Sequence, residues 1–275
     1  KVARGGNANL KSAVTLFRAA LAQGRTEKIR NRARYQLARV ASQLGDDRLV
    51  LESLKPFLSS IDDSNRAGEF DDALVLGASS FLAAGQHKPA AAAASKYLKK
   101  HPKGTLAADA LVVLAEASEL QGQAAAADLA LTRLANGFRA KPIYAQTLSR
   151  MAEASYKAKR YARAQRLFGN LVNLGPRSPF HAAGLSGRGW SLFESKKYDE
   201  AARIFQQVVK LHPRDELAAE AAYKSAESHE KAGASREAAQ AYRVAARDYP
   251  RSSFAFLSAR RAARLLSVDK QTSEA

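Results

Sequence analysis

Five histidines are the side chains of this sequence best suited to acid–base chemistry or metal binding near neutral pH. They are His87, His101, His181, His212 and His229. His229 opens the segment HEKAG, which lacks the second histidine that a helical zinc motif requires. His101 and His212 each precede a proline at one recurring position, where Tyr249 also stands. This recurrence indicates residues of a repeat linker rather than catalytic groups.

Other patterns of catalytic interest also favour a structural interpretation. Gly184, Gly187 and Gly189 superficially resemble a phosphate-binding loop, but no strand precedes them, and helix packing favours small residues there. Glu216 and Glu220 lie four residues apart on one helix face, in a setting that would not raise a carboxyl pKa. Cysteine is absent, which excludes disulfides, thiol nucleophiles and cysteine-bound zinc. We therefore predict no enzyme activity, no catalytic residues, no metal and no cofactor.

The charge of the chain points to its possible partners. The net charge is +18, which favours acidic proteins, nucleic acid or another anionic polymer, although a solvated basic surface explains it equally well. A basic cluster comes early in the chain, at Arg25, Lys28, Arg30, Arg32, Arg34 and Arg39. Four of its members, Arg30, Arg32, Arg34 and Arg39, could form a basic stripe along one helix. No apolar run approaches the roughly 18 residues that a transmembrane helix needs, so we predict no transmembrane span.

The elements that must position any site repeat along the chain. Pro176, Pro213 and Pro250 are each 37 residues apart, and a fixed period of this size indicates stacked helical units. With the proline at position 32, repeats start at Asp71, Ala108, Ala145, Ala182, Ala219 and Phe256. Good helix formers dominate the composition. We predict an all-α fold.

Four positions of the repeat have recurring residue types. Position 8 is small at Ala78, Ala115, Ala152, Gly189, Ala226 and Ala263, and position 20 at Ala90, Ala127, Ala164, Ala201 and Ala238. Two helices approach closely only where both carry small side chains, so these positions predict the crossing inside each hairpin. Position 24 is Ala94, Leu131, Phe168, Phe205 or Tyr242, and position 15 is Gly85, Gly122, Lys159, Lys196 or Gly233. Position 15 is expected in the turn and position 24 between units.

This pattern resembles the tetratricopeptide repeat (TPR). The residues that carry the resemblance are Gly189, Ala201, Phe205 and Pro213, with Tyr198 at position 17. The chain departs from the family in its period, which is longer than the usual 34 residues, and in placing Trp190 at position 9 instead of position 4. The resemblance implies a right-handed α-solenoid of about seven helix-turn-helix units.

The linkers HPKGT, HPRDE and YPRSS are similar to those of bacterial envelope TPR proteins of the Tol-Pal coordinator and outer-membrane-assembly lipoprotein type. This similarity favours the periplasm or cell envelope, with the cytoplasm as the alternative.

The phase of the repeat predicts the organisation of the chain. Residues 1–58 are expected to form N-terminal helical units, the first lacking its first helix, and residues 59–70 a polar joint. Residues 71–266 are expected to form a continuous solenoid, with a polar tail at 267–275. Val50 replaces the small residue at position 20, so its hairpin should be looser. The chain starts with Lys1, and an upstream segment could have been removed.

In the family that the chain resembles, positions 2, 5, 6, 9, 12 and 13 face the concave side of the solenoid. The residues predicted to bind a partner there are Tyr35, Arg39, Arg150, Tyr156, Trp190, Phe193, Tyr223, Lys224, Arg260 and Arg264. Aromatic and arginine side chains are frequent hot spots of protein interfaces. Trp190 and Phe193 could equally pack on a neighbouring unit, and the basic residues could simply be solvated.

These observations predict a non-enzymatic TPR scaffold that binds protein or peptide partners, expected to be acidic, within a bacterial envelope assembly. Two alternatives remain open. One is a basic solenoid that binds nucleic acid or another anionic polymer, and the other is the helical accessory region of a larger cell-wall enzyme.

Overall fold

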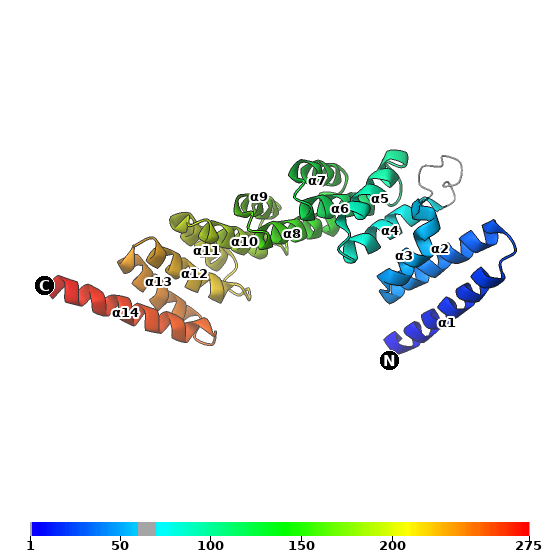
Figure 1. Ribbon diagram of the computed structural model, residues 1–275. Helices are drawn as coiled ribbons and strands as arrows, with labels where there is room; N and C mark the ends of the chain where they lie inside the picture. Colours follow the sequence, from blue (N-terminus) through cyan, green and yellow to red (C-terminus); the bar gives the residue numbers. More distant parts are fainter. Residues whose placement is uncertain (1, 60–69, 275) are drawn as a thin grey trace. The chain divides into compact units, whose positions relative to one another are not determined.

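The computed structural model describes the backbone of residues 2–59 and 70–274 and the side chains of residues 7–58 and 70–267. The described residues form fourteen α-helices and no strand, which confirms the all-α prediction (Figure 1). The first seven are α1 (Val2–Gln23), α2 (Glu27–Leu44), α3 (Asp47–Ser59), α4 (Asp72–Ala83), α5 (His87–Lys100), α6 (Ala107–Leu120) and α7 (Ala124–Phe138). The others are α8 (Pro142–Lys157), α9 (Tyr161–Val172), α10 (His181–Glu194), α11 (Tyr198–Leu211), α12 (Ala218–Lys231), α13 (Ser235–Asp248) and α14 (Phe254–Glu274).

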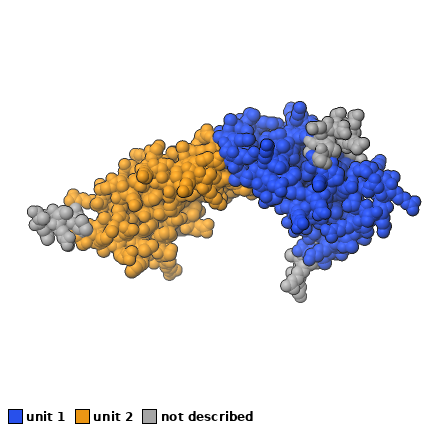
Figure 2. Space-filling model, in the orientation of Figure 1, with its two compact units in different colours: residues 1–144 blue, residues 145–275 orange. Residues whose placement is uncertain are grey.

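The helices belong to two compact units, which Figure 2 shows in different colours. Unit 1 comprises Lys1–Tyr144 and unit 2 comprises Ala145–Ala275. Within each unit, helices that follow one another along the chain pack against each other, as α4, α5, α6 and α7 do in unit 1 and α9 to α14 do in unit 2. This consecutive packing is that of a TPR-type solenoid.

The small residues of the repeat lie at the helix crossings. Ala78, Ala115, Ala152 and Ala226 at position 8, and Ala90, Ala127, Ala164, Ala201 and Ala238 at position 20, are all 0% exposed. At Gly189, a Cβ atom would lie only 2.8 Å from Cε1 of Phe205, so this crossing has no room for a methyl group. Ala263 is the exception: it is exposed, because α14 is the last helix among the described residues and no second helix of its own repeat covers this position there.

Position 15 takes the same backbone conformation whether it holds glycine or lysine. Gly85, Gly122 and Gly233 have φ of 72°, 75° and 83°, and Lys159 and Lys196 have φ of 57° and 60°. These are left-handed values, which glycine adopts without strain and other residues adopt at a cost. The geometry of the hairpin therefore dictates this turn, and two lysines are held in it.

Large side chains at position 24 fill the core between the helices. In unit 2, Phe205 and Tyr242 are fully buried and Phe168 is 7% exposed. At position 20 of the hairpin formed by α2 and α3 in unit 1, Val50 is fully buried in a cluster with Leu37 and Leu54. Val50 thus packs in the core at the position where the sequence predicted a looser hairpin.

The structure differs from expectation at the end of the last helix. We expected α14 to end at Leu266, but its backbone remains helical to Glu274. Residues 267–274 contain neither glycine nor proline, so nothing in this stretch forces the helix to stop. The predicted polar joint falls mostly on residues 60–69, which lie outside the described residues.

Candidate partner-binding site

A cavity of about 370 Å³ opens on unit 2 where the first helices of three successive repeats come together. Its lining residues are Ser149, Glu153, Tyr156 and Lys157 of α8, Phe168 of α9, Ala183, Ser186, Gly187 and Trp190 of α10, and Leu217 and Glu220 at the start of α12. Apart from Phe168 and Leu217, they occupy the repeat positions 2, 5, 6, 9, 12 and 13. The predicted binding residues Tyr156 and Trp190 therefore meet at one hollow.

The cavity owes part of its shape to Gly187. A Cβ atom at this residue would lie 2.4 Å from Cε1 of Phe168, well inside contact distance. With only hydrogen there, the Phe168 ring lies directly against α10 and forms part of the cavity wall. The glycine that superficially belongs to a phosphate loop thus serves helix packing.

Trp190 has two environments. Its ring lies edge-on to Phe205, with ring centroids 6.1 Å apart and an interplanar angle of 90°, and it packs on the core cluster of unit 2. Trp190 also lines the cavity. Phe193 packs on the same core cluster, with its ring 6.0 Å from that of Trp190. The sequence left open whether Trp190 packs in the core or lines the inner face. In the structure it does both, because one part of the ring contacts the core cluster and another part lines the cavity.

Lys224 stacks on these aromatic rings. Its Nζ lies 4.3 Å from the ring centroid of Trp190 and 5.1 Å from that of Phe193. The same ammonium donates a hydrogen bond of 2.6 Å to Oε2 of Glu227. The charge of this predicted binding residue is thus engaged within unit 2 by an aromatic face and a carboxylate.

The carboxylates of the cavity are less engaged. Glu220 is half-buried and has no hydrogen bond or ion pair with any residue that the structure describes. Glu153 accepts one hydrogen bond, of 3.0 Å, from Oγ of Ser149. Burial, followed by the charges of Glu194 and Glu220 and by Tyr161, raises the pKa of Tyr156. Lys157 is the one cationic side chain in the cavity lining.

The remaining predicted residues of unit 2 lie elsewhere. Tyr223 is buried, with its ring 5.5 Å from that of Tyr242 and 5.4 Å from that of Phe254, and therefore belongs to the core. Arg264 forms an ion pair of 2.5 Å with Glu230. Arg150 and Arg260 are exposed but do not line the cavity.

Glu230 of α12 binds polar groups from two other helices, α13 and α14. It accepts hydrogen bonds from the Tyr242 hydroxyl at 2.8 Å, from Arg261 at 3.2 Å and from Arg264. Burial, and then the hydrogen bond to Glu230, raises the pKa of Tyr242. Of the arginines that the sequence placed on a basic inner face, Arg264 is therefore partly neutralised where it lies.

In unit 1, Tyr35 and Arg39 form a small surface cluster. The Tyr35 ring lies 5.3 Å from that of Phe70, and Cζ of Arg39 lies 5.9 Å from the Tyr35 ring centroid. Burial, and then the charge of Asp72, raises the pKa of Tyr35. The structure thus places the predicted residues Tyr35 and Arg39 in contact with each other.

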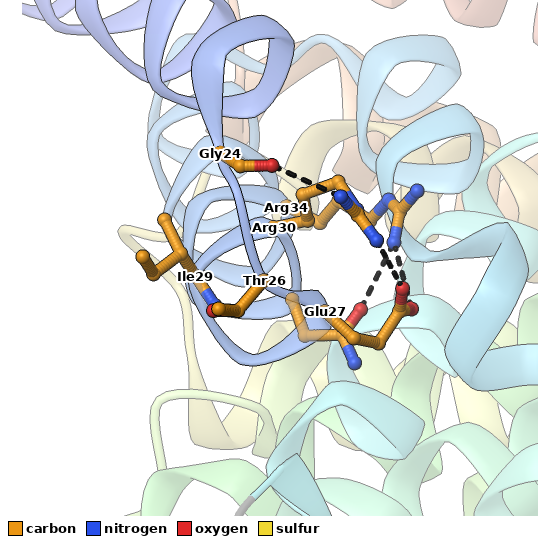
Figure 3. A network of polar contacts seen from close by, with 7 residues as sticks. Gly24, Thr26, Glu27, Ile29, Arg30 and Arg34 are labelled. Atoms are coloured by element: carbon orange, nitrogen blue, oxygen red, sulfur yellow. Dashed lines mark hydrogen bonds and ion pairs between the residues drawn. The ribbon is translucent and has the colours of Figure 1, made fainter.

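The basic stripe near the start of α2 is also partly paired (Figure 3). Arg30 donates to the carbonyl of Gly24 and to Glu27, both at 2.9 Å, and Arg34 lies 3.5 Å from the same carboxylate. The hydrogen bond from Arg30, together with the charges of both arginines, lowers the pKa of Glu27. Thr26 caps the helix by accepting from the backbone N–H of Ile29.

Sequence reasoning did not single out the anionic side of the cavity. Glu153 is at position 9 and Glu220 at position 2, so the same position rule that selected Trp190 and Tyr156 would have found both. Among the residues that the structure describes, no group of three potential ligands is placed to hold a metal ion. None of the described helices is long and apolar enough to span a membrane.

Comparison with known proteins gives matches of sequence and of fold. Two profiles, both described as the tetratricopeptide repeat, match residues 149–216 and 187–253 and residues 72–104, which together make up about half of the chain. A search of curated proteins found no significant match.

Two solved structures are similar over nearly their whole length. The first is the C-terminal part of a TPR repeat-containing protein from Cytophaga hutchinsonii, with a TM-score of 0.59 and 13% identity over 92% of this chain and 96% of that one. The second is a tetratricopeptide repeat protein from Parabacteroides merdae, with a TM-score of 0.53 and 16% identity over 94% and 93% of the two chains. At these identities the similarity shows the fold.

Proposed function

Since the chain belongs to the tetratricopeptide-repeat family, whose fold is typical of protein–protein interaction scaffolds, we propose that it is a non-enzymatic scaffold that binds a segment of another protein. The binding surface is the concave face formed by the first helices of unit 2. The observation that carries this proposal is the cavity between α8, α10 and α12.

The lining of the cavity suits a polypeptide. Tyr156, Phe168, Trp190 and Leu217 offer apolar surface to a side chain, and the carboxylates and Ser149 offer polar groups around it. Aromatic anchors that lie in a hollow with a polar rim are typical of the energetic centre of a protein interface. Grooves between helices commonly take extended or helical peptides.

The test is a selection of binding peptides on the purified chain from a phage-displayed random library. The selected peptides are then measured against Ala183→Trp, which fills the cavity, and against Gln207→Trp, which introduces the same side chain at an exposed residue of α11 outside it. We expect Ala183→Trp to abolish binding and Gln207→Trp to leave it intact. Circular dichroism and thermal melting of both variants verify the fold.

If no peptide is selected, or if the selected peptides bind Ala183→Trp as well as the original chain, the proposed surface is wrong.

For the place of action we propose the bacterial cell envelope. The support is the resemblance of the linkers HPKGT, HPRDE and YPRSS to those of envelope TPR proteins. Fractionation of native cells that carry the full-length tagged gene tests this, and a wholly cytoplasmic product would contradict it.

A further inference from the structure

The chemistry of the cavity in unit 2 differs from the basic character of the whole chain. Two carboxylates, Glu153 and Glu220, line it together with a single ammonium, that of Lys157. The charge of Glu194 also acts on Tyr156 at the same site. In a chain with a net charge of +18, this is a local excess of negative charge beside aromatic rings.

Glu220 is a half-buried carboxylate of the cavity without a compensating cation among the residues that the structure describes. A half-buried carboxylate loses part of its hydration, and a hydrogen-bonded cation normally compensates that loss. Glu220 has no such partner among the residues that the structure describes, although Glu227 and Glu230 of the same helix are both paired. A cation that entered the cavity would supply the missing interaction.

The adjoining surface already shows how a cation is bound here. The ammonium of Lys224 lies over the Trp190 ring at 4.3 Å and is held by Glu227 at 2.6 Å. An aromatic face with a carboxylate beside it is therefore a cation site in this very helix layer. The cavity presents the same combination, with Tyr156 and Trp190 as rings and Glu220 and Glu153 as carboxylates.

We propose that the cavity receives a lysine or arginine side chain of the partner polypeptide, with the aliphatic stem against Trp190, Phe168 and Leu217 and the charged end at Glu220 and Glu153. This rests on the proposed function and specifies its partner. It differs from the acidic partner that the net charge predicted, because the basic groups Lys224 and Arg264 are already paired. Long basic side chains commonly bury their stems while the charge remains near water.

Trp190 is the only tryptophan of the chain, so its fluorescence reports on the cavity directly. The probes are four peptides, acetyl-Leu-Ala-X-Ala-Leu-amide, in which X is arginine, citrulline, norleucine or glutamate. Citrulline keeps the shape of arginine without its charge, and norleucine keeps an aliphatic stem alone. We expect the arginine peptide to bind about tenfold more tightly than the citrulline peptide, and the glutamate peptide to bind least.

The variant Glu153→Gln/Glu220→Gln removes both charges while it keeps the side-chain shapes. We expect it to lose the preference for arginine over citrulline, whereas the exposed control Glu216→Gln should keep it. Glu216 lies in the turn before α12 and not, as the sequence predicted, on the same helix face as Glu220. Circular dichroism of both variants verifies the fold. If the citrulline or glutamate peptide binds as tightly as the arginine peptide, or if the arginine peptide leaves the Trp190 emission unchanged up to its solubility limit, the proposal is wrong.

The two proposals fail in different ways. One outcome is that peptides selected by phage display fail to bind Ala183→Trp and yet bind the original chain equally well after each basic residue is replaced by norleucine. That result would contradict the proposal that the cavity binds a basic side chain, and it would leave the proposed scaffold function intact. Peptides that are insensitive to Ala183→Trp would overturn the surface itself.

Discussion

Two lysines stand at a turn position where the other hairpins have glycine. Lys159 and Lys196 have φ of 57° and 60°, close to the 72° and 75° of Gly85 and Gly122. A residue with a Cβ atom is strained in this region by roughly 1–2 kcal/mol, whereas glycine is not. The strain of each lysine is compensated by the packing of the two helices that its turn connects.

Lys196→Gly should therefore stabilise unit 2. The released strain exceeds the roughly 0.5–1 kcal/mol by which glycine favours the unfolded chain, so we expect a net gain of up to about 1 kcal/mol. The measurement is the denaturation midpoint in urea. The matched control is Lys197→Gly, which has the same composition but an ordinary φ of −88° and should lower the midpoint. Equal shifts of both variants would contradict this account of the turn.

Gly187 and Gly169 offer a second comparison of one substitution at two sites. A Cβ atom at Gly187 would lie 2.4 Å from the Phe168 ring, whereas one at Gly169 would meet nothing within 4 Å. Gly187→Ala should cost about 1–3 kcal/mol or displace the Phe168 ring into the cavity. Gly169→Ala should stabilise α9 by about 0.5–1 kcal/mol, because alanine loses less conformational entropy in a helix. Thermal melting distinguishes the two, and a stabilising Gly187→Ala would show that the ring moves without cost.

At the scale of the element, the histidine before the repeat proline joins the two helices of a hairpin. It stands at the end of the second helix and contacts a side chain at the start of the first helix. Nε2 of His212, at the end of α11, lies 2.7 Å from Nδ1 of His181, at the start of α10. In an earlier hairpin, Nε2 of His101 lies 2.6 Å from Oδ2 of Asp71. Recurring linker histidines thus close hairpins through different partners, which agrees with their structural interpretation in the sequence.

The histidine pair makes unit 2 sensitive to acid. Burial, and then the charge of His212, lowers the pKa of His181 below its usual 6.5. Between that lowered pKa and about 6.5, the unfolded chain binds more protons than the folded one. The contribution of neutral His181 to the free energy of unfolding is therefore complete above about pH 6.5 and is lost as the pH falls through the lowered pKa. We expect the melting temperature to decline from pH 7.5 to pH 5.

His181→Gln should make this decline shallower, and His87→Gln, in unit 1, should leave it unchanged. A His181→Gln variant with the same pH profile as the original chain would show that other groups cause the decline.

The helix hairpins were largely predictable, because their rules are local and periodic. Ala164, Ala201 and Ala238 recur every 37 residues and are fully buried, and even the lysines at position 15 take the predicted turn. The site was less predictable. The position rule selected Tyr156 and Trp190, which both line the cavity, but the pairing of Arg264 with Glu230 joins residues 34 positions apart on different helices. Whether a charge is neutralised depends on such contacts, which periodicity does not contain.

At the scale of the whole molecule, the net charge of +18 acts independently of the cavity. Ion pairs leave this net charge unchanged, because their carboxylates are already counted in it, but they engage some of the cations locally: Arg30 and Arg34 share Glu27, and Arg261 and Arg264 share Glu230. Arg25 and Lys28 of the early basic cluster are exposed, with no ion pair to any residue that the structure describes. An anionic polymer would therefore meet this end of unit 1 as a charged surface and not as a shaped site.

We expect single-stranded DNA to bind the chain weakly and without sequence preference, with an affinity that falls steeply as salt rises from about 50 to 200 mM. Arg25→Gln/Lys28→Gln should reduce the slope of log affinity against log salt. The variant makes fewer phosphate contacts, so fewer counterions are released from the DNA when it binds. Glu153→Gln/Glu220→Gln should leave the slope unchanged, since those carboxylates lie in the cavity of unit 2. Fluorescence anisotropy of labelled DNA measures both. An affinity that barely changes with salt would rule out charge-driven binding, and a slope altered by the cavity variant would mean that DNA occupies the surface we assign to a polypeptide.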